Sequence, residues 1–418
     1  MRLALIAAVV LALFHGMNVP CTAQPLSPER VLGAQTRLAA RLANELEKQP
    51  GRQSPNIVIS PASVAGVMAL LDIGADTKMR GAIWDTLGFK PALGHDAASD
   101  LKALRATITS APQNQKPDGA AFNLANVVMF DPAAAPFPKA IKEMRDAGAE
   151  VSVAPLSDVA NIKRINEWVA KKTENLIPSI LQEQPLPPGL IAVNALYFKG
   201  LWPKPFAKDQ TNPQAFHMVS GDLEVPMMRN FGSYSFRRDG DFAAIEMPYR
   251  GGRYMLVLVT NTARSLLLAG FANVTGWLDG SGFATKQVDL ALPRFTLEAG
   301  EELLDPLKQI GLKNGMDSAT AFEGLTAMPQ EISRVVQKTY LKVDEEGTEA
   351  AAATAAVTVT SAMPRGEPEK LAIDRPFVFA LRDRQSGLVL ISGYIGKPVT
   401  GPAADRGAPN QLASEKKP

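Results

Sequence analysis

Residues 193–202 read VNALYFKGLW and close an apolar run that begins at Leu190. Across Leu190–Phe198 the run is rich in β-branched and aromatic side chains, which favour a β-strand. Three further runs carry the same signal, at Tyr254–Thr260, Val288–Leu292 and Val378–Ile391. We therefore expect a framework of strands assembled from segments that lie far apart in the sequence.

Helical patterns lie between these strands. A first helix is predicted over 27–48, where Ser27 is a good cap and Pro28 fits the first turn. A short β-rich run, Asn56–Ile59, precedes a second predicted helix over Ser60–Leu71. The remaining helical stretches lie at 137–147, 159–181, 264–278 and 299–311. Helices and strands are mixed without regular βαβ alternation, which favours an α+β architecture.

Composition excludes several classes of function. The 418 residues include one Cys and three His, too few for zinc ribbons, disulfide scaffolds or thiol redox sites. A formal net charge of +2 gives no basis for non-specific nucleic-acid binding. We therefore expect no metal, no cofactor and no nucleic-acid partner. The length alone suggests two or three domains.

The N-terminus has the pattern of a secretory signal. Arg2 precedes the apolar run Leu3–Phe14, which is too short to span a membrane. Small residues at Cys21 and Ala23 favour cleavage after Ala23, so we expect a secreted or periplasmic protein; a lipid anchor on Cys21 is the alternative. At the other end, 401–418 is rich in Pro, Ala and charge, and we expect a disordered tail.

Catalytic signatures are missing from the sequence. There is no GxSxG elbow, no P-loop, no GxGxxG and no kinase motif set. His95 and His217 are far apart and lack any metal-ligand spacing, so ordinary surface or hydrogen-bonded roles are expected for both. We therefore expect that the chain is not an enzyme, although a hydrolase on an unrelated fold remains an alternative.

Residues 344–362 read DEEGTEAAAATAAVTVTSA and differ from the rest of the chain. An acidic start with one Gly leads into an alanine block and then into alternating Val and Thr, so helix and strand preferences conflict. A flexible linker is the simplest interpretation of such a segment. However, two strongly apolar strands, Phe377–Leu381 and Leu388–Ile395, follow and need a sheet to complete. A linker between domains would not stand just before the last strands of a fold.

Several motifs together resemble the serpin family from Ser27 to about Val399. Asn56–Ser63 (NIVISPAS) resembles the start of the family's shutter helix, and Asn166–Trp168 lies in a stretch that resembles its INEWV element. The 193–202 run resembles the family's VNAxYFKGxW strand, and 345–353 resembles the inhibitory hinge. Ile373–Phe377 resembles the family's C-terminal signature. The resemblance implies one domain over 24–400, with three β-sheets, eight to nine helices and an exposed reactive loop over about 345–370.

The resemblance also implies a function. Inhibitory serpins are suicide substrates of serine proteases: the cleaved loop inserts as a strand into the central sheet and traps the acyl-enzyme. The hinge of this chain consists of Glu345, Glu346, Gly347, Thr348, Glu349, Ala350, Ala351, Ala352 and Ala353. One alternate set of the loop, from Thr348 to Thr360, contains only Ala and Thr, which can be buried on insertion without an unpaired charge. The loop therefore resembles the inhibitory type rather than the non-inhibitory binding or chaperone type.

The position of the scissile bond follows from counting along the loop. The family's usual spacing from Glu345 places it at Ser361–Ala362, with Thr360 as a close neighbour, which suits elastase-like or subtilisin-like enzymes. Met363 would suit chymotrypsin-like or elastase-like pockets, but Pro364 follows it and hinders cleavage. Arg365 would attract trypsin-like enzymes, at the cost of a longer released strand.

Supporting residues carry over one by one. Ser60, Ser63 and Asn194 match the family's shutter, and Gln337 stands where His is common, with an amide that could bond Asn194 but cannot gain charge. Glu345 and Arg294 match the ion pair of the breach, below which Trp202 packs. The region that corresponds to the heparin-binding helix of some serpins, 97–112, contains only two basic residues, Lys102 and Arg105, so no heparin site is expected. We expect a monomer whose partner is a serine protease.

Overall fold

The computed structural model describes residues 26–52, 54–111, 120–263, 274–348 and 367–399. Its helices are α1 (Pro28–Glu47), α2 (Pro61–Leu71), α3 (Thr77–Thr86), α4 (Ala97–Ser110), α5 (Pro138–Asp146), α6 (Val159–Lys172), α8 (Leu304–Leu307), the π-helical turn Lys308–Leu312 and α9 (Lys313–Met316). Strands and helices alternate irregularly along the chain, so the mixed α+β prediction is confirmed.

The central sheet of six strands is built around the run that opened the sequence analysis. Its order is β10 (Phe295–Glu302), β11 (Ile332–Val343), β4 (Leu190–Leu201), β2 (Ala120–Phe130) and β3 (Glu150–Val153), and β12 (Gly347–Thr348) also pairs with β4. The neighbours β4 and β11 run parallel, whereas β10 and β2 flank them in antiparallel pairs. Nine of the twelve residues of β4, from Leu190 to Phe198, are buried in succession, because both faces of the strand are covered.

The second sheet has nine strands. It runs in the order β1 (Ile57–Ile59), β15 (Val389–Ile395), β14 (Phe377–Asp383), β8 (Tyr254–Asn261), β7 (Phe242–Pro248), β6 (Gly221–Asp239), β9 (Ala284–Pro293) and β13 (Glu369–Ala372), with β5 (Asn212–Met218) paired to β6. The expected third sheet is not separate among the described strands. Because β6 is 19 residues long, it pairs successively with β5, β9 and β7 and joins the two groups.

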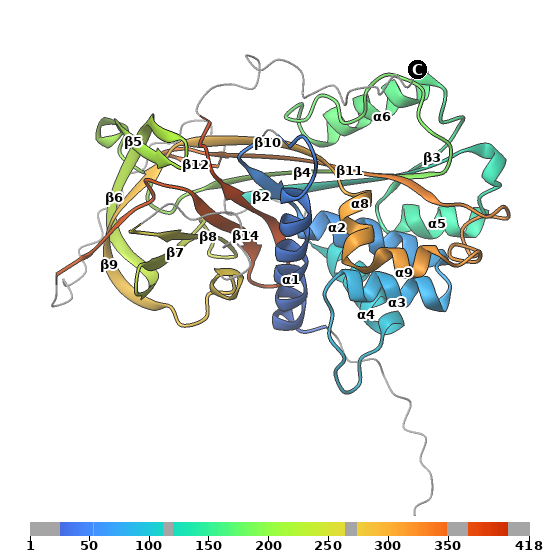
Figure 1. Cartoon of the computed structure of the whole chain (residues 1–418), viewed down its shortest axis with the longest axis horizontal. Coiled ribbons are helices and arrows are strands. Elements are labelled where there is room, and N and C mark those ends of the chain that lie inside the picture. The colour runs from blue at the N-terminus through green and yellow to red at the C-terminus, as the bar shows by residue number, and fades with distance from the viewer. Residues whose placement is uncertain (1–25, 53, 112–119, 264–273, 349–366, 400–418) are drawn as a thin grey trace, which may run out of the picture.

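The helices cover the central sheet unequally. Figure 1 shows α1–α5, α8 and α9 gathered on one side of the sheet, while α6 lies alone on the other. A large hydrophobic core lies under the first group, and a smaller one joins α6 to the outer face of β2, β4 and β11. No helix of the described residues is apolar over a stretch long enough to cross a membrane.

Two predicted helices differ from the structure. The stretch 299–302 belongs to β10 rather than to a helix, because Glu298 and Glu302 on that strand pair with Lys338 and Arg334 of β11. The helix predicted over 159–181 ends at Lys172, since Glu174 and Asn175 adopt positive φ angles of 51° and 64°. Most of the helix predicted over 264–278 lies outside the described residues.

Candidate functional site

The predicted hinge begins where β11 reaches the end of the central sheet. After Val343 the chain turns through Asp344–Glu346 and re-enters the sheet as β12, antiparallel to β4, with Gly347 opposite Leu201 and Thr348 opposite Gly200. Gly347 has a φ of 146°, and a Cβ there would lie 2.0 Å from the carbonyl oxygen of Gly200. The entry of the hinge into the sheet thus requires glycine at this position.

Thr348 occupies a closed site at this entry. Its side chain is fully buried, and its hydroxyl lies 2.7 Å from the hydroxyl of Tyr249. Tyr249 in turn stacks on Trp202, with ring centroids 4.4 Å apart, and burial raises the pKa of its phenol well above the usual value. The indole of Trp202 donates to the carbonyl of Asp344 at 3.0 Å, so the aromatic stack also holds the turn.

Glu345 lies beside this stack and is also buried. Its carboxylate accepts a hydrogen bond from Thr211 at 2.9 Å and faces the guanidinium of Arg294 at 3.5 Å, while its carbonyl accepts from the amide of Phe206 at 2.7 Å. The predicted proximity of Glu345 and Arg294 therefore holds in the structure. The carboxylate and the backbone carbonyl of Glu345 are thus both bonded, and these contacts fix the direction in which the hinge leaves β11.

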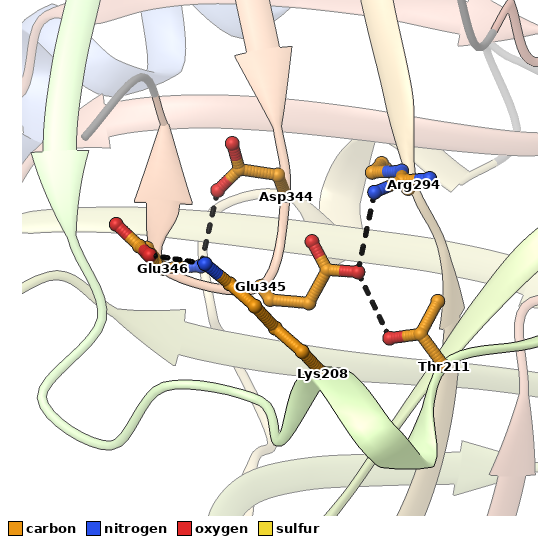
Figure 2. Close-up of a pocket in the computed structure, with 6 residues that line it drawn as sticks. All are labelled: Lys208, Thr211, Arg294, Asp344, Glu345 and Glu346. Atoms are coloured by element: carbon orange, nitrogen blue, oxygen red, sulfur yellow. Dashed lines mark hydrogen bonds and ion pairs between the residues drawn. The ribbon is translucent and has the colours of Figure 1, made fainter. Parts of the chain in front are cut away.

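A polar cavity of about 420 Å³ opens next to Glu345, and Figure 2 shows the side chains around it. The residues that line it are Lys208, Thr211, Arg294, Asp344, Glu345 and Glu346. Lys208 donates to Glu346 at 2.7 Å, and this hydrogen bond raises the pKa of the exposed lysine. Lys208 pairs with Glu346, and Arg294 pairs with Glu345. These ion pairs hold the turn at the hinge in place.

A second polar group lies at the middle of β4 and β11, under the start of α2. Gln337 uses both ends of its amide on Ser60: it accepts from the backbone N–H at 2.7 Å and donates to the carbonyl at 3.0 Å. The hydroxyl of Ser60 accepts from the amide of Ser63 at 3.1 Å and caps α2. Gln337 therefore bonds the backbone of Ser60 rather than the side chain of Asn194, contrary to expectation.

Asn194 bonds a neighbour that the sequence did not single out. It lies opposite both Gln337 of β11 and Asn126 of β2 in the sheet register, and its side-chain amide donates to the side-chain oxygen of Asn126. Ser60, Ser63, Asn126, Asn194 and Gln337 are all buried. The two strands are thus fastened to different partners, with β4 tied to β2 and β11 tied to α2.

Several predicted residues have no structural description. Glu349, Ala350, Ala351, Ala352, Ala353, Thr360, Ser361, Ala362, Met363 and Arg365 lie outside the described residues, as do Cys21 and Ala23. By contrast, Tyr249, Thr211 and Lys208 contact the hinge although nothing in the sequence near 345 indicates them. They lie between 99 and 138 residues away in the chain from the hinge residues that they contact. The three-dimensional structure brings them to the hinge.

The two described histidines are not part of this site. His95 lies 2.6 Å from Asp100, a buried carboxylate that also accepts from Arg30 and Trp84, and His217 lies 2.8 Å from Asp222. Within the described parts of the chain, no group of three or more His, Cys, Asp and Glu side chains is arranged to hold a metal ion. The site at the hinge is therefore built from hydrogen bonds, ion pairs and aromatic stacking.

Comparison with known proteins gives one consistent family. The model of the family described as "Serpin (serine protease inhibitor)" matches residues 33–398. Human glia-derived nexin is 30% identical over 396 residues, covering 90% of this chain and 94% of that protein. The leukocyte elastase inhibitor of Sus scrofa is 29% identical and covers 88% of this chain and 100% of that protein.

Solved structures agree with the sequence comparison. Native protease nexin-1 with heparin superposes with a TM-score of 0.73 at 26% identity, over 89% of this chain and 100% of that one. Human thyroxine-binding globulin superposes with a TM-score of 0.75 at 22% identity, over 90% of this chain and 100% of that one. The name of the first protein refers to a protease and the name of the second refers to the binding of thyroxine, although the two share the fold.

Proposed function

The chain belongs to the serpin family, and we propose that it is an irreversible inhibitor of serine proteases that acts as a suicide substrate. One relative is named as an inhibitor of leukocyte elastase and another as a nexin, whereas a third is named for binding thyroxine. Family membership alone therefore does not fix the activity. The observation that carries the proposal is the position of the hinge beside β4. Thr348 is already buried beside β4, in the place where an inserting strand would start.

The topology of the central sheet favours insertion. The seam between β4 and β11 is a parallel pair, and β12 enters it antiparallel to β4. A full strand in this direction would be antiparallel to both neighbours and would replace one parallel ladder by two antiparallel ones, which are slightly more stable per residue. The proposed driving force is therefore the completion of this sheet.

The chemistry belongs to the protease. Its serine hydroxyl attacks the carbonyl carbon of Ser361, the bond to Ala362 breaks, and the proton released by the serine passes to the leaving amine. An ester then joins protease and inhibitor. Insertion of the freed strand carries this ester to the far end of the sheet before water can attack it. In this proposal the chain contributes a substrate bond and is not an enzyme.

The proposal extends to partners and location. We propose a secreted monomer of one domain, 24–400, released by cleavage after Ala23. We also propose that it needs no heparin, although the solved structure of native protease nexin-1 contains heparin. On α4, Arg105 is turned inward to the carbonyl of Ala69 and to Asp72, which leaves Lys102 as the exposed cation of the predicted region among the described residues.

The test is a search for a covalent complex. We expect a panel of elastase-like, subtilisin-like, chymotrypsin-like and trypsin-like enzymes to include one that forms a denaturation-resistant complex, with mass spectrometry locating the cut at Ser361–Ala362 rather than at Thr360, Met363 or Arg365. Thr348→Arg should convert the chain into a substrate that is cleaved without trapping, because an unpaired charge would have to be held at the buried position of Thr348 in the sheet, at a cost of several kcal/mol.

The matched control is Thr348→Val, which keeps the shape of the side chain without adding charge. This variant should still form the complex. Clean cleavage of the wild type without any complex would favour the non-inhibitory binding or chaperone alternative, and a complex that persists in Thr348→Arg would contradict the insertion mechanism. Proteolysis of an added substrate by the chain alone would point to a hydrolase.

A further inference from the structure

The part of the second sheet where β6 and β9 lie side by side carries an exposed aromatic side chain (Figure 1). Phe231 of β6 is 48% exposed, and its neighbours on the same face, Arg229 and Ser233, are exposed as well. Met228 and Asn230, which alternate with them along the strand, are buried. At this point β6 therefore turns one face to the solvent, with a large apolar ring at its centre.

Charged residues border this ring. Asp289 of β9 lies directly opposite Phe231, and Lys370 of β13 lies directly opposite Asp289. Residues that are paired across neighbouring strands share a face of the sheet. We call Arg229, Phe231, Asp289 and Lys370 the sheet patch. An aromatic centre with arginine and a polar border is the usual anatomy of a protein–protein contact, in which such residues supply most of the binding energy.

The sheet patch is held firmly by its surroundings. The carbonyl of Phe231 accepts from the ammonium of Lys204 at 2.9 Å, and the side-chain amide of Asn230 donates to the carbonyl of Lys204 at 3.3 Å. Next to Lys370, Leu371 is buried and keeps β13 against the core. A surface that is ordered before binding loses little conformational freedom when a partner docks. The patch is therefore suited to a partner that binds without remodelling it.

The sheet patch lies on the sheet into which the reactive loop leads. Ala362, on the far side of the proposed scissile bond, precedes Glu369 at the start of β13 by seven positions. Seven residues span at most about 25 Å when fully extended. A domain of about 230 residues has a radius of gyration of about 17 Å, so its diameter exceeds this span. A protease bound to the scissile bond is thus large enough to reach the patch.

We propose that the sheet patch is a second contact for the target protease, made outside its active-site cleft. The inference rests on the proposed function, because the partner is the protease that the loop engages. Phe231 fits a shallow apolar site on that enzyme. Arg229 and Lys370 outnumber Asp289, so the patch favours an enzyme whose surface beside the cleft is acidic. The patch would therefore discriminate between proteases that cleave the same bond.

The test is the equilibrium binding of inactive enzymes to the whole protein. Each enzyme of the protease panel is used with alanine in place of its active-site serine, so that neither acylation nor insertion takes place. Phe231→Ala should weaken binding about tenfold, which is the effect of removing a central aromatic residue of an interface. Arg229→Gln should lower the association rate about threefold at low salt and by less at high salt, because the attraction is screened.

Two further variants show whether the ring itself makes the contact. Phe137→Ala is the matched control, because Phe137 is 39% exposed at the start of α5, outside the second sheet, and this variant should bind like the wild type. Phe231→Tyr keeps the ring and should bind nearly as well as the wild type. A merely structural role of Phe231 would instead lower the urea midpoint of Phe231→Ala and leave its affinity for the inactive enzymes unchanged.

The outcomes separate the sheet patch from the proposed function. Weaker binding of Phe231→Ala, with no active enzyme trapped by the wild type, would support the patch and contradict the inhibitory function. Trapping by the wild type, with equal binding of all variants, would support the inhibitory function and overturn the patch. Equal losses in Phe231→Ala and Phe137→Ala would also overturn the patch, as would a failure of every inactive enzyme to bind.

Discussion

The contact between Thr348 and Tyr249 allows a quantitative prediction about the hinge seat. Both side chains are fully buried and their hydroxyls are 2.7 Å apart. Tyr249→Phe leaves the hydroxyl of Thr348 without this partner, and Thr348→Val does the same to Tyr249, so each change should reduce the free energy of unfolding by about 1–3 kcal/mol. The double variant removes both polar groups and keeps the shape, so it should lie close to the wild type.

Urea unfolding of the four proteins gives the coupling energy, which should exceed about 1 kcal/mol. Tyr254→Phe is the control, because Tyr254 lies in the same aromatic group, 5.3 Å from Phe198, and should show no coupling to Thr348→Val. Hydrogen exchange at residues 347–348 provides an independent assay, since an unsatisfied hydroxyl favours departure of β12 from the sheet. Additive losses, or single variants as stable as the wild type, would refute the reasoning.

Two further predictions concern the hinge turn and the buried tyrosines. Gly347→Ala should expel β12, because the added Cβ would lie 2.0 Å from the carbonyl oxygen of Gly200; faster hydrogen exchange and faster proteolysis at the hinge than in Gly221→Ala would show this, and equal rates would contradict it. Burial raises the pKa of Tyr254 and Tyr394 to about 12, above an unfolded value of about 10. Stability should therefore be lost as the pH rises from about 10 to 12, less so in the doubly Phe-substituted variant. Tyrosinate absorbance near pH 10 that is present in the folded wild type and lost in the doubly substituted variant would contradict the burial argument.

Strong local signals explain which parts of the fold were predictable. The apolar run at 190–198 and the capped helix that starts at Ser27 appear in the structure nearly as predicted, because burial on both faces and a hydroxyl cap are properties of neighbouring residues. The helix prediction for 299–302 was wrong because the preference of these residues for helix is local, whereas Glu298 and Glu302 form ion pairs with the neighbouring strand β11. Long-range pairing overrides a weak propensity.

The site shows the same division. Glu345, Arg294 and Trp202 could be named from motif resemblance, since each stands in a recognisable stretch of sequence. The partner of Gln337 could not, because an amide has two equivalent ways to satisfy its hydrogen bonds, and the choice of Ser60 depends on where α2 begins. The contact of Tyr249 with Thr348 likewise depends on the register between strands that are distant in the sequence.

The seat of Thr348 has a kinetic consequence. Strand addition resembles other cooperative ordering processes, in which the first contact is slow and each later residue adds quickly. In this chain the first contact already exists, so the proposed insertion would begin from a nucleus rather than from a free loop. Its rate should then depend on how fast the seam unzips ahead of the growing strand, and hardly at all on how long the loop takes to find the sheet.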